Sequence, residues 1–143
     1  MRLLPRRRNV AIRRFDEAAG RWVDTDSADV VDRDELTVAT FNIWFDDYHA
    51  EQRYRAIADL LRARRPDVIA LQEVTPTAFE LFVGQPWVRD EYLSVAAVGA
   101  GTGNYGMLMF SRVPVARATY TRLPTRQSRG FLDAELAVQG TRE

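Results

Sequence analysis

The chain has 143 residues, 46% of them apolar, which is enough to bury the core of one ordinary domain. Its basic residues, all of them arginine, balance its acidic residues, so no overall positive field directs the protein to nucleic acid or to a membrane surface. It has no cysteine and a single histidine, His49, which excludes disulfides, cysteine nucleophiles and zinc sites built on thiolates or several imidazoles.

The first part of the chain differs in composition from the rest. Residues 10–15 and 21–24 are predicted to be two short strands, because β-branched and aromatic residues flank a glycine-containing turn. Residues 25–35 are rich in aspartate, which predicts a solvated linker. We therefore expect an N-terminal hairpin and linker extension over residues 1–35, followed by a domain over residues 36–143.

Three consecutive arginines, Arg6, Arg7 and Arg8, stand near the start of the chain. A guanidinium group binds phosphate oxygens through two parallel hydrogen bonds, so this cluster could contact a phosphate. A run of charges is also typical of a solvated arm that contacts nothing. Composition leaves both interpretations open.

A β-α-β unit is predicted where the sequence pattern becomes regular. Residues 36–43 and 67–74 are rich in apolar and β-branched side chains, as in strands that are buried in a sheet. Residues 50–65 are predicted to form a helix, because apolar side chains recur on one face and charged ones on the other. The predicted buried face of this helix consists of Tyr54, Ile57, Ala58 and Leu61.

The rest of the chain is predicted to hold one more helix and four strands. Thr75 is a suitable N-cap and Pro76 a suitable first residue for a helix that ends near Val83. The predicted strands, which we expect to be antiparallel neighbours, are residues 92–98, 105–111, 115–123 and 131–138. The fold class that follows is an α/β sandwich whose sheet mixes parallel and antiparallel pairs.

One glycine-rich motif matches a pattern whose chemistry the chain does not support. Residues 101–106 (GTGNYG) fit the loop that binds dinucleotides, in which a helix follows at once and its N-terminus holds the pyrophosphate. Here a predicted strand follows instead of a helix. We interpret the segment as a hairpin loop at the rim of an active site.

Two polar residues, Asn42 and Glu73, stand at the ends of otherwise apolar predicted strands. The strands of a β-α-β unit usually lie side by side, so both residues are expected at the same edge of the sheet. A buried carboxylate must be paired or bound to a metal, and Mg²⁺ prefers oxygen ligands of this kind. The alternative is that Glu73 pairs with an arginine and Asn42 caps a turn. The spacing alone leaves both open.

Several segments resemble one enzyme superfamily. Residues 40–43 (TFNI), Arg53 and residues 66–74 (PDVIALQEV) resemble the opening of the endonuclease/exonuclease/phosphatase superfamily, which has the DNase I-like fold. Residues 105–113 and 128–136 are most similar to its tyrosyl-DNA phosphodiesterase 2 branch. This resemblance implies a four-layer α-β-β-α sandwich and hydrolysis of phosphate esters that depends on Mg²⁺ or Mn²⁺.

The resemblance also implies roles for individual residues. Glu73 corresponds to the metal-binding glutamate, and Asn42 corresponds to the asparagine beside the metal and the phosphate. Arg129 matches an active-site arginine at the start of a strand. Tyr105 matches an aromatic residue that faces the substrate, and we expect Asn104 beside it to bind substrate as well.

The chain departs from the superfamily pattern in two places. Trp44 stands where this branch has an aspartate, which leaves the substrate class open. The later motifs of the superfamily, which supply a catalytic histidine and further aspartates, have no counterpart before Glu143, and His49 matches none of them. We therefore expect these residues to be the N-terminal half of a larger domain and to be inactive alone. An uncovered sheet face would also favour self-association.

The leading hypothesis is a phosphoesterase that acts on a phosphodiester, with nucleic acid as one substrate class. One alternative is a non-catalytic remnant, or a module of the same fold that binds phosphate or nucleic acid. Another is a phospholipid hydrolase of the sphingomyelinase type. No apolar run is long enough to span a bilayer and the basic start lacks the apolar stretch of a secretory signal. We therefore expect a cytoplasmic protein without stable membrane association.

Overall fold

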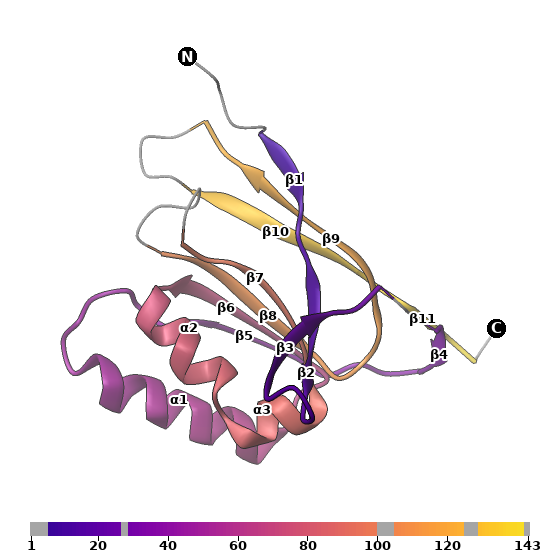
Figure 1. Cartoon of the computed structure of the whole chain (residues 1–143), viewed down its shortest axis with the longest axis horizontal. Coiled ribbons are helices and arrows are strands. Elements are labelled where there is room, and N and C mark those ends of the chain that lie inside the picture. The colour runs from indigo at the N-terminus through magenta and orange to yellow at the C-terminus, as the bar shows by residue number, and fades with distance from the viewer. Residues whose placement is uncertain (1–5, 27–28, 100–104, 125–128, 142–143) are drawn as a thin grey trace.

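The computed structural model describes residues 6–26, 29–99, 105–124 and 129–141. Figure 1 shows its helices on one side of a sheet and a smaller sheet on the other. The helices are α1 (Ala50–Arg64), α2 (Pro76–Val83) and α3 (Pro86–Glu91). The strands are β1 (Arg7–Asn9), β2 (Ile12–Asp16), β3 (Arg21–Asp24), β4 (Val31–Asp32), β5 (Val38–Asn42), β6 (Val68–Val74), β7 (Leu93–Ala97), β8 (Gly106–Ser111), β9 (Val115–Arg122), β10 (Gly130–Leu136) and β11 (Val138–Gln139).

The predicted β-α-β unit is present as β5, α1 and β6. Strands β5 and β6 are parallel neighbours, in register from Val38 opposite Val68 to Asn42 opposite Gln72. Helix α1 is followed by its C-cap Arg65, whose backbone adopts the left-handed conformation and donates its N–H to the carbonyl of Leu61. The four apolar residues predicted to face the sheet from this helix are all buried. They pack beneath β6 and supply much of the hydrophobic core.

The second predicted helix is also confirmed, and a third follows it. The Thr75 hydroxyl accepts the backbone N–H of Ala78 at 3.1 Å, so α2 has the predicted side-chain cap. Helix α3, which has only six residues, was not predicted from the sequence. Pro86 at its first position was the available signal. So short a helix shows no clear periodicity, and it is stabilised by packing of Val88 into the core.

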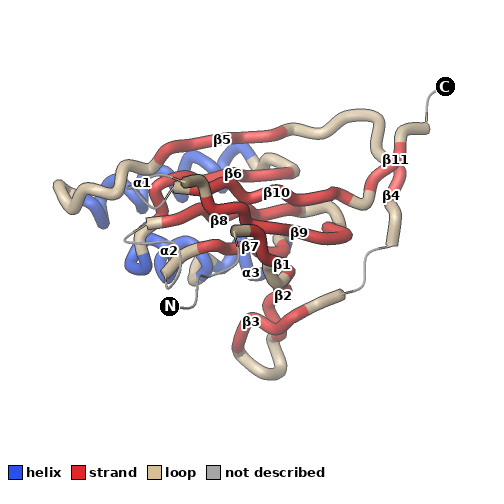
Figure 2. Tube along the Cα trace, turned by 90° about the horizontal axis from the view of Figure 1, so that it is seen from above, coloured by secondary structure: helices blue, strands red, loops and turns tan. Residues whose placement is uncertain are grey.

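Six strands form the larger sheet, in the order β3-β2-β7-β8-β6-β5. Figure 2, which looks from above, shows the helices together beneath this sheet. Only the β5–β6 pair is parallel, and the other neighbours are antiparallel, as predicted for a mixed sheet. Residues 106–111 after the glycine-rich motif form β8 rather than a helix, which agrees with the exclusion of a dinucleotide site. Residues 101–104 of that motif lie outside the described residues.

A second sheet has the order β1-β9-β10 and covers the middle of the first. A separate apolar cluster fills the space between the sheets, with contributions from Val10, Ile12, Val95, Val115 and Tyr120. The fold class is confirmed as a DNase I-like sandwich, with one helical layer and both sheets in place. No helix covers the outer face of the smaller sheet within the described part of the chain.

The structure differs from the prediction of a solvated linker over residues 25–35. Within it, β4 pairs in parallel with β11, near the C-terminus. Arg33 also forms an ion pair with Asp67. The charges that suggested a solvated segment are therefore partly used in long-range contacts, which composition does not reveal. The segment before it joins the sheets as well, because β2 pairs with β7 and β1 with β9.

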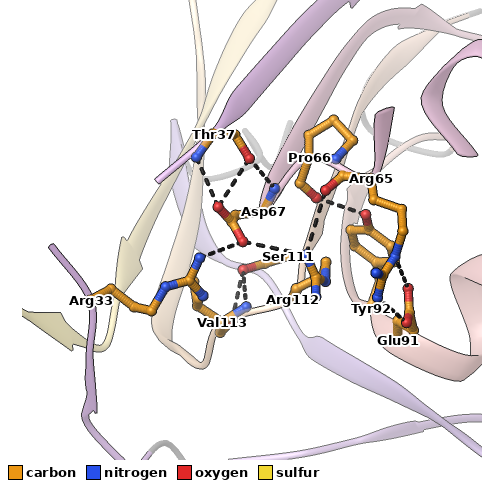
Figure 3. Close-up of polar contacts among 10 residues, drawn as sticks. All are labelled: Arg33, Thr37, Arg65, Pro66, Asp67, Glu91, Tyr92, Ser111, Arg112 and Val113. Atoms are coloured by element: carbon orange, nitrogen blue, oxygen red, sulfur yellow. Dashed lines mark hydrogen bonds and ion pairs between the residues drawn. The ribbon is translucent and has the colours of Figure 1, made fainter. Parts of the chain in front are cut away.

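Asp67 connects this N-terminal part to the start of β6 (Figure 3). Its side chain is 6% exposed, and it accepts hydrogen bonds from Arg33 at 2.6 Å and from the backbone and hydroxyl of Thr37 at 2.8 and 3.0 Å. Arg112 lies 3.5 Å away on the other side. Burial raises the pKa of this carboxyl group, but the hydrogen bonds and the Arg33 charge outweigh burial and lower its pKa to about 2.

One of the two edge strands of the larger sheet is β5, on which Val38 is 63% exposed. Such an edge presents unpaired backbone groups and an apolar side chain to solvent. Self-association through an exposed sheet face stays a prediction. None of the helices in the described residues is long and apolar enough to cross a bilayer.

Candidate functional site

The site begins with an irregularity near the end of β6. The pairing of β6 with β8 shifts register between Leu71 and Val74, which marks a β-bulge. Glu73 lies in this bulge and has a φ of 58°, in the left-handed region that non-glycine residues rarely adopt. The bulge removes Glu73 from the regular alternation of the strand and turns its side chain toward a cavity at the sheet end. Backbone strain of this kind is concentrated at functional sites.

The cavity has a volume of about 110 Å³ and lies between the ends of the two sheets. The Glu73 carboxylate is 12% exposed, and its oxygen lies 3.8 Å from a guanidinium nitrogen of Arg129. The same guanidinium lies over the Tyr105 ring, 5.3 Å from its centroid. The lining includes Gln72, Glu73, Tyr105, Tyr120, Arg129 and Gly130. One carboxylate, one guanidinium and two phenol rings thus surround a space of about one small chemical group.

Asn42 is exposed and lies on the neighbouring strand, opposite Gln72. Its side-chain oxygen accepts the backbone N–H of Trp44 at 3.0 Å, so it caps the turn that follows β5. Capping a turn is the role that the sequence left open for Asn42 as the alternative to metal binding. The oxygen has two lone pairs, and the cap uses one of them. Asn42 does not line the cavity around Glu73.

Aromatic side chains project from the loop after β5. Phe45 stacks on Tyr105, with ring centroids 4.8 Å apart and planes 14° from parallel. Trp44 and Tyr48 are exposed beside it, and Trp44 has a φ of 63°. From the sequence, Trp44 was noted only as a departure from the superfamily pattern, and the grouping of aromatic side chains on this loop was not predicted. The loop forms an aromatic surface next to the cavity.

Arg53 of α1 holds this loop in place. Its guanidinium donates hydrogen bonds to the backbone carbonyls of Ile43 at 2.7 Å, Trp44 at 3.2 Å and Tyr48 at 2.8 Å, and also to Asp46. It also lies 4.6 Å from the centroid of a Trp44 ring. Arg53 is one of the residues on which the family resemblance rests, and the structure gives it a positioning role.

The structure therefore brings Glu73, Tyr105 and Arg129 together, although they come from separate segments. Asn42 lies one strand away, and Asn104 lies outside the described residues. His49 is the N-cap of α1, where its ring packs against Tyr48, and it does not line the cavity.

Two lining residues, Tyr120 and Gly130, were not identified from the sequence. A Cβ atom at Gly130 would lie 2.3 Å from the Tyr120 hydroxyl oxygen, so glycine is required for this close approach. A glycine directly before the predicted strand 131–138 was the available signal for Gly130. Burial raises the pKa of the Tyr120 phenol, while the charges of Arg8 and Arg122 lower it, and the net direction is upward.

No group of three or more His, Cys, Asp or Glu side chains is placed to hold a metal ion within the described ranges. The two metal ligands predicted from the sequence at this end of the sheet are the Glu73 carboxylate and the Asn42 amide oxygen. Mg²⁺ is often bound by one or two carboxylates, with water and substrate phosphate as the other ligands. A donor set this small fits a metal that binds together with a phosphorylated ligand.

Comparison with known families decides the relationship. Residues 39–142 match the model of the Endonuclease/Exonuclease/phosphatase family. The chain belongs to this family. Members of the Endonuclease/Exonuclease/phosphatase family are phosphoester hydrolases, which agrees with a cavity that places a carboxylate beside a guanidinium group. The family predicted from the motifs is confirmed.

Similarity to the first of two solved structures supports the same fold. D. rerio TDP2 in complex with a single-strand DNA product is 22% identical, with a TM-score of 0.58 over 69% of this chain and 39% of that chain. A D. rerio TDP2 humanized by 14 mutations is 16% identical, with a TM-score of 0.49 over 69% of this chain and 48% of that one. The chain thus spans less than half of the structures it matches. No curated protein sequence matches it.

Proposed function

We propose that the protein is a metal-dependent phosphoesterase that acts on phosphodiesters in nucleic acid. In this proposal the chain supplies the part of the active site that contains Glu73 and Arg129. The observation that carries it is Glu73, held in a strained bulge with its carboxylate turned into a cavity beside Arg129. A stable fold has no need of a left-handed glutamate at this position, because any regular β-strand residue would continue the pairing.

Arg129 and the aromatic residues have distinct roles in this proposal. The Arg129 guanidinium is 46% exposed, so it can bind phosphate oxygens while its Tyr105 contact fixes its orientation. Phe45 and Tyr105 already stack on each other, and the exposed Trp44 ring lies on the same loop as Phe45. Unpaired nucleic acid bases stack on such surfaces, whatever their sequence. The arrangement therefore favours nucleic acid over a phospholipid headgroup.

A divalent metal would be held by the Glu73 carboxylate, with the Asn42 amide on the neighbouring strand as a further oxygen donor. When bound, Mg²⁺ or Mn²⁺ would offset the charge that develops on the phosphate oxygens during hydrolysis. Arg129, which lines the same cavity, would bind and orient the same phosphate. Its approach to Glu73 at 3.8 Å is loose enough for a phosphate to take over the guanidinium.

Hydrolysis also needs a group that orients the attacking water and a donor for the leaving oxygen. The single histidine of these 143 residues, His49, lies at the N-terminus of α1 and away from the cavity. We therefore propose that this chain binds a phosphodiester without measurable turnover, and that the activity belongs to a longer protein. By itself, this chain would then act as a module that binds phosphate or nucleic acid, which is one of the alternatives stated from the sequence.

The test is metal-dependent binding of a fluorescein-labelled single-stranded oligonucleotide, measured by anisotropy with and without Mn²⁺. We expect Mn²⁺ to strengthen binding at least about fivefold, because a metal held by Glu73 would offset the negative charge of the phosphate. Glu73→Gln should remove this enhancement, since a neutral amide is a weaker ligand. Glu17→Gln makes the same chemical change in an exposed turn and should leave it intact.

Hydrolysis assays complete the experiment, with bis(p-nitrophenyl) phosphate and a sphingomyelin analogue as substrates. An unchanged Mn²⁺ enhancement in Glu73→Gln would overturn the proposal for this glutamate. Hydrolysis of the sphingomyelin analogue that depends on Glu73 would instead support the phospholipid hydrolase considered from the sequence. Hydrolysis of the phosphodiester that disappears in Glu73→Gln would show that the chain completes its own site, contrary to the expectation of no turnover.

A further inference from the structure

Strand β1, which lies outside the region that matches the family, places an arginine against Tyr120, a residue that lines the cavity. It pairs with β9 at the edge of the smaller sheet, with Arg8 opposite Tyr120 (Figure 1). The Arg8 guanidinium lies over the Tyr120 ring, 5.3 Å from its centroid. Directly opposed residues in an antiparallel pair have side chains on the same face of the sheet. Arg8 therefore lies on the face that carries Tyr120.

Arg122 lies on the same face. It follows Tyr120 by two residues in β9, so strand alternation places its side chain on the same side. The backbones of Arg6 and Arg122 are hydrogen-bonded at 2.7 Å, which continues the pairing of β1 and β9 to this end of the sheet. Arg8 and Arg122 are thus near one phenol ring, and both of their charges act on its ionisation.

The positive charges of Arg8 and Arg122 are not compensated within the described residues. Neither side chain forms an ion pair with an acidic residue there, whereas Arg117, also in β9, pairs with Glu135 and Arg13 of β2 pairs with Asp24. Two neighbouring guanidinium groups without a counter-charge attract an anion. Arg8 is exposed and Arg122 is partly exposed, so an anion in solution can reach both.

Tyr120 connects these arginines to the candidate site, because it lines the same cavity as Glu73 and Arg129. Gly130, which also lines the cavity, is paired in register with Arg122. A phosphate held between Arg8 and Arg122 would therefore lie next to a phosphate held at Glu73.

We propose that Arg8 and Arg122 form a second phosphate-binding subsite, which takes the phosphate adjacent to the one at Glu73 in the same nucleic acid strand. The subsite rests on the proposed function and extends it from a single phosphodiester to a polynucleotide backbone. It gives β1 a role in substrate binding, with the N-terminal arginines acting as part of the smaller sheet.

The test compares two ligands in the presence of Mn²⁺: a fluorescein-labelled thymidine hexanucleotide, and thymidine 5′-monophosphate as a competitor that carries one phosphate. Arg8→Gln and Arg122→Gln should each weaken hexanucleotide binding by about tenfold and reduce the slope of its salt dependence by about one. Binding of the monophosphate should change less than twofold, because it needs only the cavity at Glu73.

Arg7→Gln is the matched control. Arg7 is the preceding residue of β1, so its side chain lies on the opposite face, and its replacement makes the same change in net charge. We expect it to leave both affinities unchanged. Thermal unfolding of each variant shows that the fold is retained, and Arg8→Lys, which keeps the charge, should retain most of the hexanucleotide affinity.

Equal effects of Arg7→Gln and Arg8→Gln would overturn the subsite, because they would reflect net charge alone. So would unchanged hexanucleotide affinity in Arg8→Gln and Arg122→Gln while the Mn²⁺ enhancement still depends on Glu73, a result that leaves the proposed function intact. If the monophosphate shows no Mn²⁺-dependent binding, the proposed function itself fails.

Discussion

Strand β6 has a carboxylate at each end, and the two differ in their hydrogen bonds and in their backbone conformation. Asp67, just before the strand, is buried and receives several short hydrogen bonds. Glu73, near the other end, has one looser ion pair at 3.8 Å and lies in a strained bulge. Both carboxylates face arginine, so the presence of a partner does not distinguish them. The two carboxylates differ instead in the number and length of their contacts and in backbone conformation.

The difference separates a carboxylate that stabilises the fold from one that is available for a ligand. The hydrogen bonds of Asp67 favour its charged form strongly enough to lower its pKa to about 2. They also connect the N-terminal segment, through Arg33, to the first residues of β5 and β6. Glu73 has no such network among the described residues. Its ion pair leaves coordination positions for a metal or for the hydrogen bonds of a substrate complex.

The largest expected effect concerns neither carboxylate but the packing beneath β6. Leu61 is 3% exposed and packs in the core between α1 and the sheet. Leu61→Ala should lower the free energy of unfolding by about 2–5 kcal/mol, the range for a buried leucine truncation. Urea denaturation measures it, with Leu60→Ala as the control, because the adjacent Leu60 is 47% exposed. A loss below about 1 kcal/mol would mean that α1 does not pack as described.

The sequence was informative where the structure is regular. The apolar period of 3.6 located α1, and runs of β-branched residues located β5, β6 and the strands that follow them. Local signals of this kind say little about which distant strands pair. The pairing of β1 with β9 and of β4 with β11 depends on the packing of the two sheets, and charged composition suggested solvated segments there.

In the candidate site, too, local motifs were predictable and long-range geometry was not. Glu73, Tyr105 and Arg129 were predicted from motifs, and the structure places them around one cavity. The bulge that turns Glu73 was not predictable, because it arises from a register shift against β8. Tyr120 was not predicted either, because its place in the site depends on the stacking of the two sheets and on a close approach to Gly130.

Asp67→Asn should give the next largest effect, a loss of about 2 kcal/mol in the free energy of unfolding at pH 7. The amide keeps the shape of the side chain but loses the charge that Arg33 and Thr37 stabilise. Urea denaturation measures the loss. Asp59→Asn is the control, because Asp59 is exposed on α1. Equal stability of Asp67→Asn and the unmodified protein would contradict a structural role for the network.

The pH dependence tests the charge of Asp67 directly. Its pKa is about 2 in the folded protein and has its ordinary value near 3.8 when unfolded. Because the folded pKa is the lower one, the stabilisation is complete above the unfolded pKa and decreases as pH falls from about 4 to about 2. The stability difference between the unmodified protein and Asp67→Asn should therefore shrink over this interval. A constant difference between pH 7 and pH 2 would show that packing, not charge, is responsible.

Glu73→Gly should have the smallest effect on stability, and one of opposite sign. Glycine adopts a φ of 58° without the steric cost that glutamate pays, so the free energy of unfolding should rise by about 1 kcal/mol. Gln72→Gly is the control: it changes the preceding residue of β6, which is not among those with positive φ, and should lower stability by about 0.5–1 kcal/mol. Urea denaturation of both variants, with the Mn²⁺ enhancement of oligonucleotide binding measured in parallel, decides the outcome. If Glu73→Gly is stabilised and loses that enhancement, the strained bulge is retained for binding. If it is destabilised like Gln72→Gly, Glu73 stabilises the fold as Asp67 does, and the distinction between the two ends of β6 does not hold.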